Sequence, residues 1–462
     1  MRTENTQLDK IKEIASAQKG YFSTGATLDI KFRREMLRRL EQGLHAYEKA
    51  LCDALWHDLH KSYEEAYLTE ISIVYGEIRQ HLRHLSRWAR RRKSPTPLKL
   101  FPSKSYSVKE PLGNSLIIAP WNYPVQLLLN PLVGAISAGC TAMLKPSPYV
   151  PQVSQVLAQL ISETFEEQYI AVAQGNREVN TALLEERWDL IFFTGSPDLG
   201  KKVMAAAAKN LTPVVLELGG KSPCIIDRGA DIAVAAKRIA WGKSLNAGQT
   251  CIAPDYILIH PEVKGEFVQA FGNEIRSLHG ADIKESVHYV RMVSDKAFER
   301  VSSYLKDGKI LYGGGIDAGE RFIEPTLLEV TNTDAPVMQE EIFGPIFPVI
   351  TIEGEFREEV IKFVNGREKP LAFYYFGREG DGWEYILRTS SGGGCINDVI
   401  MHIANEGVPF GGVGNSGMGR YHGKDSFEAF SHTRTIISTG TWIDLPFRYM
   451  PYKMFSLVKR LL

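Results

Sequence analysis

The sequence predicts an α/β protein that folds as two domains, each built around a mainly parallel sheet. From Asn114 to Lys209, short apolar runs alternate with segments of helical periodicity, which is the order of a parallel sheet covered by helices. The alternation restarts after Gly220, and 462 residues are too many for a single hydrophobic core. We therefore expect two domains of roughly 200 residues each and a small appendage.

The segment from Gln7 to about Lys93 has the apolar spacing of helices, with apolar residues three, four and seven positions apart. It ends in the basic run Arg87–Lys93, which fits either a basic patch or, as we favour, a solvated helix end. The next segment, Ser94–Pro111, begins with prolines and then alternates from Ser103 to Glu110. This alternation predicts a strand or hairpin that leaves the main body.

The first α/β unit is predicted from the segments that follow. Its strands are expected at Asn114–Ala119, Thr141–Lys145, Ile170–Gln174 and Asp189–Phe193, and its helices at Val125–Ala138, Pro151–Phe165 and Lys201–Lys209. The glycine turn Thr194–Gly200 exposes N–H groups at a helix start, which suits a phosphate. Such turns also occur as simple helix starts, and no G-x-G-x-x-G follows any predicted strand. A dinucleotide would therefore bind here in an unusual way.

The second α/β unit is predicted after Gly220. Its strands are expected at Ser222–Asp227, Tyr256–His260 and Phe347–Ile352, and its helices at Ile232–Leu245 and Val263–Leu278. The glycine-dense loop Pro409–Arg420 indicates backbone packed closely against a neighbouring domain or a substrate mouth. A last strand is expected at Thr433–Ser438, followed by an amphipathic tail over 451–462.

Two residues in this pattern have the chemistry to form and hydrolyse a thioester. Cys251 lies in the tight junction Asn246–Pro254, where backbone N–H groups can point outward. Glu217 follows the apolar run Pro213–Leu216, so its carboxylate is expected at the end of a buried strand. A thiol nucleophile and a desolvated carboxylate are the groups required. Either residue alone could be structural, since lone cysteines are often small buried hydrophobes.

Composition excludes several other classes of function. Lys plus Arg and Asp plus Glu both number 54, so nothing favours a nucleic-acid partner. The five cysteines include no C-x-x-C pair, which predicts a reducing compartment and no metal site. The first residues lack the apolar core of a signal peptide, and no run approaches the ~18 apolar residues of a membrane span. We expect a cytoplasmic protein.

Six motifs occur in a fixed order between Glu110 and Arg434. They are Pro120-Trp121-Asn122-Tyr123-Pro124, Lys145-Pro146-Ser147, Thr194-Gly195-Ser196, Glu217-Leu218-Gly219-Gly220, Gly248-Gln249-Thr250-Cys251 and Glu341-Ile342-Phe343-Gly344-Pro345. Together they resemble the aldehyde dehydrogenase superfamily, and their details resemble its class 3 branch of fatty and aromatic aldehyde dehydrogenases.

The resemblance implies an aldehyde dehydrogenase-like fold with three parts. These are a Rossmann-like nicotinamide-dinucleotide-binding domain (1–93 and 112–218), a catalytic domain (219–410) and a small β oligomerisation arm with bridging segments (94–111 and 411–462). Class 3 relatives pair strand edges across a dimer. Since Ser103–Glu110 and Thr433–Ser438 would leave open edges in an isolated monomer, we expect a homodimer. Contact of the 451–462 tail with a membrane is an alternative to docking on the partner subunit, which we favour.

The resemblance also implies NAD- or NADP-dependent oxidation of a medium- or long-chain aliphatic or aromatic aldehyde to the acid. Cys251 would attack the aldehyde carbon to give a thiohemiacetal, whose oxyanion the Asn122 amide and the Cys251 N–H would stabilise. After hydride transfer, Glu217 would activate water to hydrolyse the thioester, and burial would raise its pKa towards a useful range. Tyr123, Trp241 and Phe410 are expected to line an apolar aldehyde tunnel, although aromatic residues are more often core.

Cofactor contacts follow from the same resemblance. Lys145 would reach the adenine ribose, and Glu341 with Phe343 the nicotinamide ribose and ring, unless these two are a loop acid and a core residue. The turn residues expected near the pyrophosphate are Gly195, Ser196 and Gly200. The family usually has a Glu after Lys-Pro-Ser, which binds the ribose and repels a 2′-phosphate; here Pro148 occupies that position. We therefore expect NADP to be accepted at least comparably with NAD, unless a neighbouring acid or carbonyl replaces the contact.

Two other functions remain open at this point. An acylating relative would pass the acyl group to coenzyme A or phosphate, and Glu217 argues against it because such relatives generally lack this base. A non-catalytic structural or binding homologue is the other alternative, and the presence of Cys251, Asn122 and Glu217 argues against it.

Overall fold

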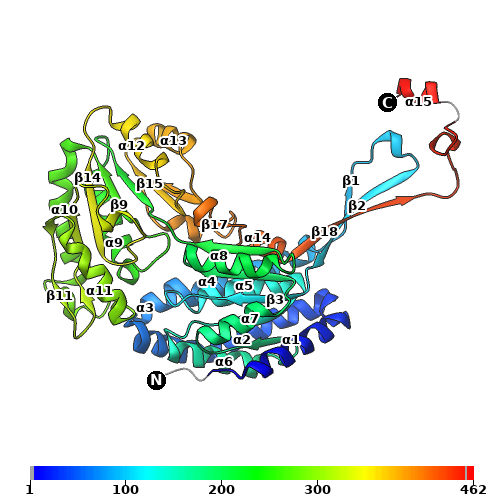
Figure 1. Ribbon diagram of the computed structural model, residues 1–462, viewed down its shortest axis with the longest axis horizontal. Coiled ribbons are helices and arrows are strands. Elements are labelled where there is room, and N and C mark those ends of the chain that lie inside the picture. Colours follow the sequence, from blue (N-terminus) through cyan, green and yellow to red (C-terminus); the bar gives the residue numbers. More distant parts are fainter. Residues whose placement is uncertain (1–4, 453–454, 462) are drawn as a thin grey trace.

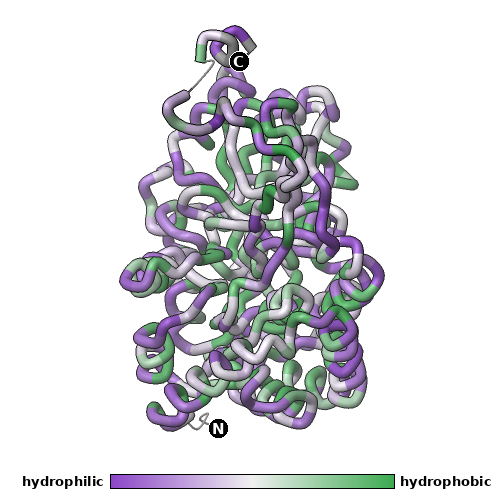
Figure 2. The backbone as a smooth tube through the Cα atoms, turned by 90° about the vertical axis from the view of Figure 1, so that its right-hand side faces the viewer, coloured by the Kyte–Doolittle hydropathy of each residue, from purple (hydrophilic) through white to green (hydrophobic). Residues whose placement is uncertain are grey.

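The computed structural model describes residues 5–452 and 455–461, which form two lobes and an arm that projects away from them (Figure 1). Each lobe contains one sheet with helices packed on both faces, so the predicted α/β class is confirmed. Figure 2 shows apolar segments, in green, running through the interior, while the outer helices and loops carry most of the hydrophilic purple.

The sheet of the first lobe has six strands in the order β17-β7-β6-β3-β4-β5. Neighbouring strands are parallel except β17, which runs antiparallel to β7. The strands are β3 (Asn114–Ile118), β4 (Thr141–Lys145), β5 (Ile170–Val172), β6 (Leu190–Gly195), β7 (Val214–Leu218) and β17 (Gly417–Met418).

Helices cover both faces of this sheet because apolar side chains alternate along buried strands. In β3, Leu116 and Ile118 pack in one apolar cluster and Ile117 in another. The first cluster includes helices α1 (Leu8–Ser23), α7 (Arg177–Glu185) and α8 (Pro197–Ala208). The second includes α2 (Ile30–Leu59), α4 (Ser72–Trp88), α5 (Gln126–Ala138), α6 (Pro151–Thr164) and α14 (Lys424–Ala429).

The strands and helices predicted for this unit are all present. The largest shift is at α8, which begins at Pro197 instead of Lys201. Proline suits the first turn of a helix because its missing N–H would have had no partner there. The glycine turn is therefore shorter than predicted.

The sheet of the second lobe has seven strands in the order β10-β13-β14-β9-β8-β15-β16. Only β10 is antiparallel to its neighbour. The strands are β8 (Pro223–Ile226), β9 (Tyr256–Ile259), β10 (Lys309–Tyr312), β13 (Thr326–Glu329), β14 (Ile346–Thr351), β15 (Ala372–Phe376) and β16 (Gly393–Ile396). Helices α9 (Ile232–Ser244) and α10 (Pro261–His279) cover one face, and α11 (Asp295–Ser303), α12 (Phe356–Asn365) and α13 (Glu379–Arg388) the other.

The helical amino-terminal segment is confirmed, with one irregular stretch. Between α2 and α4 lie the short helix α3 (Tyr63–Ala66) and a π-helix, Tyr67–Ile71. Such π-turns often lie at functional sites. The basic run does not remain helical to its end, because α4 stops at Trp88 and Arg92 begins strand β1 (Arg92–Ser94).

The arm is a three-stranded antiparallel sheet in the order β1-β2-β18 (Figure 1). Strands β2 (Ser103–Pro111) and β18 (Ser431–Thr439) pair along their whole length, so these two edges are satisfied within one chain. The expectation that both edges stay open in a monomer is therefore corrected. Among the described strands, β18 still has one edge without a neighbour.

The carboxyl-terminal segment contributes to the first lobe before it reaches the arm. Strand β17 joins β7, and α14 packs against α5. Beyond the arm, Figure 1 places α15 (Phe455–Leu461) near the arm's tip. Met454 and Leu462, which belong to the predicted apolar face of the tail, lie outside the described residues. A search of the described helices finds none with the length and apolarity to cross a membrane.

Candidate active site

Cys251 follows a turn with unusual backbone angles. Asn246 and Ala247 have φ values of 50° and 52°, and Gly248 has a φ of 72°. Left-handed angles are uncommon for residues other than glycine and cost on the order of 1–3 kcal/mol each. At Gly248 a side chain would also meet the carbonyl oxygen of Gly344. The turn therefore brings the thiol close to the loop that carries Glu341 and Phe343.

Hydrogen bonds from polar residues of the motif hold this turn. The Asn246 side-chain amide donates to the carbonyls of Asn122 (3.1 Å) and Gln249 (3.0 Å). The Gln249 amide donates to the carbonyls of Asn246 (3.0 Å) and Arg291 (3.1 Å). These two side chains, which are buried, replace regular secondary structure in fixing the loop.

Two cavities meet at Cys251. A cleft of about 1130 Å³ is lined by residues of both lobes, and a tunnel of about 370 Å³ runs among apolar side chains. Cys251, Thr194 and Leu127 line both cavities. The thiol therefore lies where a molecule in the cleft and a molecule in the tunnel would come together.

Glu217 lines the tunnel at the end of β7. Glu217 is only 3% exposed, and neither of its carboxyl oxygens has a hydrogen-bond partner within the described chain. Burial raises the pKa of Glu217 well above the usual carboxyl range. A carboxyl group of this kind is suited to take a proton from water near neutral pH.

Burial also raises the pKa of the Cys251 thiol, and the nearby charges of Glu341 and Glu217 raise it further. A raised pKa disfavours the reactive thiolate. Activation needs either a base or a nearby positive charge.

Asn122 is buried and lines the cleft. Its side-chain amide donates one hydrogen bond to the Gln249 carbonyl at 3.0 Å, which leaves its second N–H available. Its backbone carbonyl accepts hydrogen bonds from Lys61 Nζ (3.1 Å) and the Asn246 amide (3.1 Å). The structure thus brings Asn122, Glu217 and Cys251 together around the junction of the two cavities.

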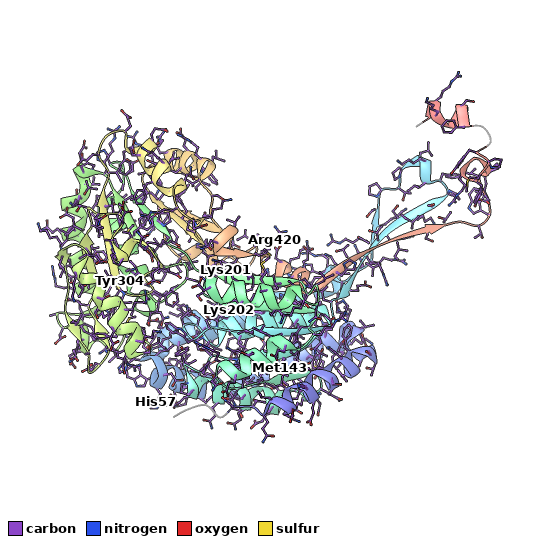
Figure 3. All side chains as sticks on the ribbon, in the orientation of Figure 1. His57, Met143, Lys201, Lys202, Tyr304 and Arg420 are labelled. Carbon is purple, nitrogen blue, oxygen red and sulfur yellow. The ribbon has the colours of Figure 1, made fainter. Side chains whose placement is uncertain are left out.

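The cleft has the features of a dinucleotide site. Gly195 and Ser196 line it at the start of α8, where no side chain of the described residues caps the helix. The free N–H groups and the helix dipole favour a phosphate at that position. Lys201, labelled on α8 in Figure 3, also lines the cleft, together with Arg300. The sequence interpretation missed both cations, whose positions only the folded lobes define.

Glu341 and Phe343 line the same cleft. The Glu341 carboxyl lies directly over Gly219, where any side chain would collide with it. Burial raises the pKa of Glu341 to about 8. The Phe343 ring lies edge-on to Trp121, with ring centroids 5.4 Å apart. Neither residue is a remote loop acid or a core residue.

Lys145 and Gly200 are placed differently from the other candidates. Lys145 is 1% exposed, donates to the Pro146 carbonyl at 2.8 Å, and is absent from the lining of the cleft in the described structure. Burial lowers the pKa of its ammonium group to about 8. Gly200 lets α8 approach β7, since a Cβ there would lie 2.7 Å from Leu218 Cδ2.

The turn after β4 contains Pro148, and a carboxylate does lie near it. Asp58 accepts hydrogen bonds from the backbone N–H groups of Gln152 (2.9 Å) and Val153 (3.0 Å). It therefore caps helix α6. Both bonds go to the same carboxylate oxygen, Oδ2.

Tyr123, Trp241 and Phe410 all line the tunnel, as expected. The Tyr123 hydroxyl is hydrogen-bonded to Thr250 at 2.7 Å, so its ring presents an apolar surface. Leu68 and Ile73, from the helical amino-terminal segment, complete part of the wall. The tunnel fits a hydrophobic chain.

Comparisons with known proteins agree with this geometry. The model of the family described as "Aldehyde dehydrogenase family" matches residues 2–436. The chain is 47% identical to 4,4'-diaponeurosporen-aldehyde dehydrogenase of Staphylococcus aureus, over 94% of this chain and 95% of the relative. It is 42% identical to the dimeric NADP-preferring aldehyde dehydrogenase of Canis lupus familiaris, over 93% and 95%. The solved substrate-bound state of Staphylococcus aureus AldH superposes with a TM-score of 0.95 at 46% identity, covering 98% and 99% of the two chains.

Proposed function

Because the chain belongs to the aldehyde dehydrogenase family, and so is an enzyme that oxidises aldehydes with NAD or NADP, we propose a specific reaction for it. The enzyme converts a medium- or long-chain aliphatic or aromatic aldehyde to the carboxylic acid through a thioester on Cys251. The observation that carries this proposal is the position of Cys251 at the junction of the cleft and the apolar tunnel. It lies beside the buried carboxyl group of Glu217, which has no hydrogen-bond partner among the described residues. The apolar tunnel supports a hydrophobic substrate.

The first half of the reaction forms the thioester. The Cys251 sulfur attacks the aldehyde carbon while the thiol proton passes to solvent water, and a thiohemiacetal results. The free N–H of the Asn122 amide and the Cys251 backbone N–H stabilise the oxyanion. The oxidised nicotinamide, held in the cleft, would supply the acceptor for the hydride of the aldehyde carbon. The carbon is thereby oxidised to the level of an acid and remains attached to sulfur.

The second half releases the acid. Glu217 takes a proton from water, and the hydroxide attacks the thioester carbon. The carbon–sulfur bond breaks, the sulfur recovers the proton from Glu217, and the carboxylic acid leaves. The raised pKa of Glu217 fits this step, because a weakly acidic carboxyl group is a stronger base once it is ionised.

The proposal includes a division of the chain into domains and a set of cofactor contacts. The dinucleotide-binding domain is 1–93 and 112–218, the catalytic domain 219–410, and 94–111 with 411–462 the bridging and oligomerisation segments. Gly195, Ser196 and Lys201 would hold the pyrophosphate, and Glu341 with Phe343 the nicotinamide ribose and ring. Gly200 would act by packing alone. Lys145 would have to turn from the Pro146 carbonyl to reach the ribose.

Product analysis tests the reaction against its acylating alternative. We expect purified enzyme, oxidised cofactor and a series of alkanals to give reduced cofactor and carboxylic acid in equal amounts without coenzyme A or phosphate. Reduction of the cofactor that requires coenzyme A or phosphate, with acyl-CoA or acyl phosphate as the product, would overturn the hydrolytic assignment. Absence of turnover with every aliphatic and aromatic aldehyde would overturn the oxidation itself.

Pro148→Glu is expected to shift the ratio of kcat/KM values towards NAD by roughly tenfold, the equivalent of ~1.4 kcal/mol. The wild-type turn offers no carboxylate of its own to the ribose, and Asp58 is engaged in capping α6. An added acid would accept ribose hydrogen bonds and repel a 2′-phosphate. Pro148→Gln is the uncharged control. Wild-type enzyme that ignores NADP, or an unchanged ratio in the Glu variant, would refute this account.

A homodimer is expected to form through the arm. Ile436 and Ile437 of β18 are 39% and 46% exposed, and they lie on opposite faces of a strand with a free edge in the described structure. Multi-angle light scattering at micromolar concentration should give the mass of two chains. Ile437→Lys should weaken the dimer, whereas Val287→Lys, at an exposed apolar position of the second lobe, should not. A wild-type monomer would contradict the proposal.

The proposed placement of the 451–462 tail is on the partner subunit. Its described part lies near the tip of the arm (Figure 1), which is the element proposed to contact the partner. Flotation with anionic liposomes, with and without residues 451–462, separates this placement from membrane contact.

A further inference from the structure

We propose that the buried ion pair between Lys61 and Glu70 is a positioning device that sets the oxyanion donor Asn122, an inference that rests on the proposed function. The pair joins the helical amino-terminal segment to the loop that carries Asn122. Its two side chains are fully buried, with Lys61 Nζ 2.7 Å from Glu70 Oε1.

Lys61 is directed inward by the end of helix α2. His60, just before it, has a φ of 61°, the left-handed conformation that terminates many helices. Lys61 Nζ then donates to Glu70 and to the Asn122 carbonyl, the latter at 3.1 Å. It also lies 4.2 Å from the centre of the Tyr123 ring, a favourable place for a cation. One ammonium group thus contacts two consecutive residues of the Asn122 loop.

Glu70 holds the same loop from its other end. It lies in the π-helix Tyr67–Ile71, and its second oxygen accepts the backbone N–H groups of Val125 (2.7 Å) and Gln126 (3.3 Å). These N–H groups belong to the beginning of α5 and have no partner inside the helix. The backbone between Asn122 and Gln126 is therefore fixed at both ends by one ion pair.

A third residue of the same segment holds the Cys251 turn. Glu65 Oε1 accepts the backbone N–H of Asn246 at 2.9 Å. The Asn246 side chain in turn donates to the Asn122 carbonyl, which Lys61 also contacts. The amino-terminal segment therefore fixes the Asn122 loop relative to the loop that supplies the Cys251 N–H. These are the two donors of the proposed oxyanion site.

A buried ion pair is a weak source of stability, because desolvation of both charges offsets their attraction and apolar pairs often replace them without loss. A displacement of about 1 Å at a catalytic group, by contrast, lowers rates by about 10²-fold. The contacts of Lys61 and Glu70 all converge on the Asn122 loop. The pair therefore acts on the rate through Asn122.

The test separates folding from positioning with the double variant Lys61→Met/Glu70→Gln. It removes both buried charges, and the Gln amide oxygen still accepts the Val125 N–H. We expect a melting temperature close to that of the wild type. We also expect kcat/KM for aldehyde to be at least ~10-fold lower, because kcat falls while KM changes little. The loss of kcat/KM in the double variant should not exceed the loss in Asn122→Ala, which is about 10²–10³-fold for removal of an oxyanion donor.

A mutant cycle identifies the route of the effect. If Lys61 acts through Asn122, the double variant should lower kcat/KM much less in an Asn122→Ala background. The alkylation rate of Cys251 by iodoacetamide and the dissociation constant of the cofactor should stay within twofold of wild type. If the double variant does not fold, Lys61→Gln/Glu70→Gln replaces it, because it also removes both buried charges and its two amides can still bond to each other.

A folded variant with kcat/KM within twofold of wild type would overturn the proposal, as would equal losses with and without Asn122. Failure of the proposed function has a different signature. In that case the wild-type enzyme itself gives no aldehyde-dependent reduced cofactor and no acyl adduct on Cys251.

Discussion

Cys251→Ala is expected to produce no reduced cofactor with any aldehyde. The hydride can leave the aldehyde carbon only after a nucleophile has added to it and made it tetrahedral, and Cys251 is the sulfur at the junction of the cleft and the tunnel. We expect activity to fall by at least about 10⁴-fold, the scale of losing a nucleophile. Fluorescence of the reduced cofactor, followed over hours, detects activity at this low level.

The matched control is Cys395→Ala. Cys395 is the other partly exposed cysteine, whereas Cys52, Cys140 and Cys224 are buried. The control variant should turn over aldehyde normally. Residual steady oxidation by Cys251→Ala above the uncatalysed rate would assign the nucleophile elsewhere.

Glu217→Gln is expected to give up to one equivalent of reduced cofactor per active site and then to stop. The thioester still forms, because Cys251 and the oxyanion donors are unchanged, but water lacks its base. Loss of a general base slows a step by about 10²–10⁴-fold. Intact mass spectrometry should show the acyl group on the protein, and peptide mapping should place it on Cys251.

Glu341→Gln is the informative comparison, because Glu341 is a second, half-buried carboxyl group close enough to raise the pKa of Cys251. Among the described residues that line the two cavities, Glu341 lines the cleft and not the tunnel. Its amide variant should weaken cofactor binding or slow the burst without accumulating an acyl adduct. Steady turnover by Glu217→Gln near the wild-type rate, or an adduct found in Glu341→Gln instead, would transfer the role of base.

The raised pKa of Glu217 adds a pH signature to this prediction. Ionised Glu217 is the active base, and its population increases as pH rises through the raised pKa. Deacylation should therefore accelerate with pH in the wild type. At a pH well below that pKa, the wild type should show the same burst as Glu217→Gln.

Local sequence patterns predicted most of the fold because each strand and helix carries its own periodicity. Strand Thr141–Lys145 and the helix from Ile232 are examples in which apolar runs and flanking polar residues mark the ends. Cys251 and Asn122 were predicted as site residues through the resemblance that the six motifs carry together, because a lone cysteine is often a small buried hydrophobe. Both residues lie in loops between predicted elements, where functional side chains are concentrated.

Contacts between residues far apart in the chain could not be predicted from the sequence. Lys61, Glu65 and Glu70 follow an amphipathic helix, where charges usually indicate a solvated face, and nothing in their spacing shows that they turn inward to Asn122 and Asn246. Lys145 shows the same limit. The resemblance implies a contact with the adenine ribose, which stays a prediction, and the sequence does not show that the buried side chain bonds the adjacent Pro146 carbonyl.

The arm has a consequence for the synthesis of the protein. Ser103 of β2 and Thr439 of β18, hydrogen-bonded at 2.8 Å, lie 336 residues apart, so at roughly 5–20 residues per second translation separates them by roughly 20–70 s. During that interval β2 exists on the nascent chain without the strand that later covers it, and an unpaired edge of this kind recruits other chains. The lysines within β2, at positions 104 and 109, oppose such pairing by charge. Folding of the arm therefore depends on protection of β2 at the ribosome until β18 has been made.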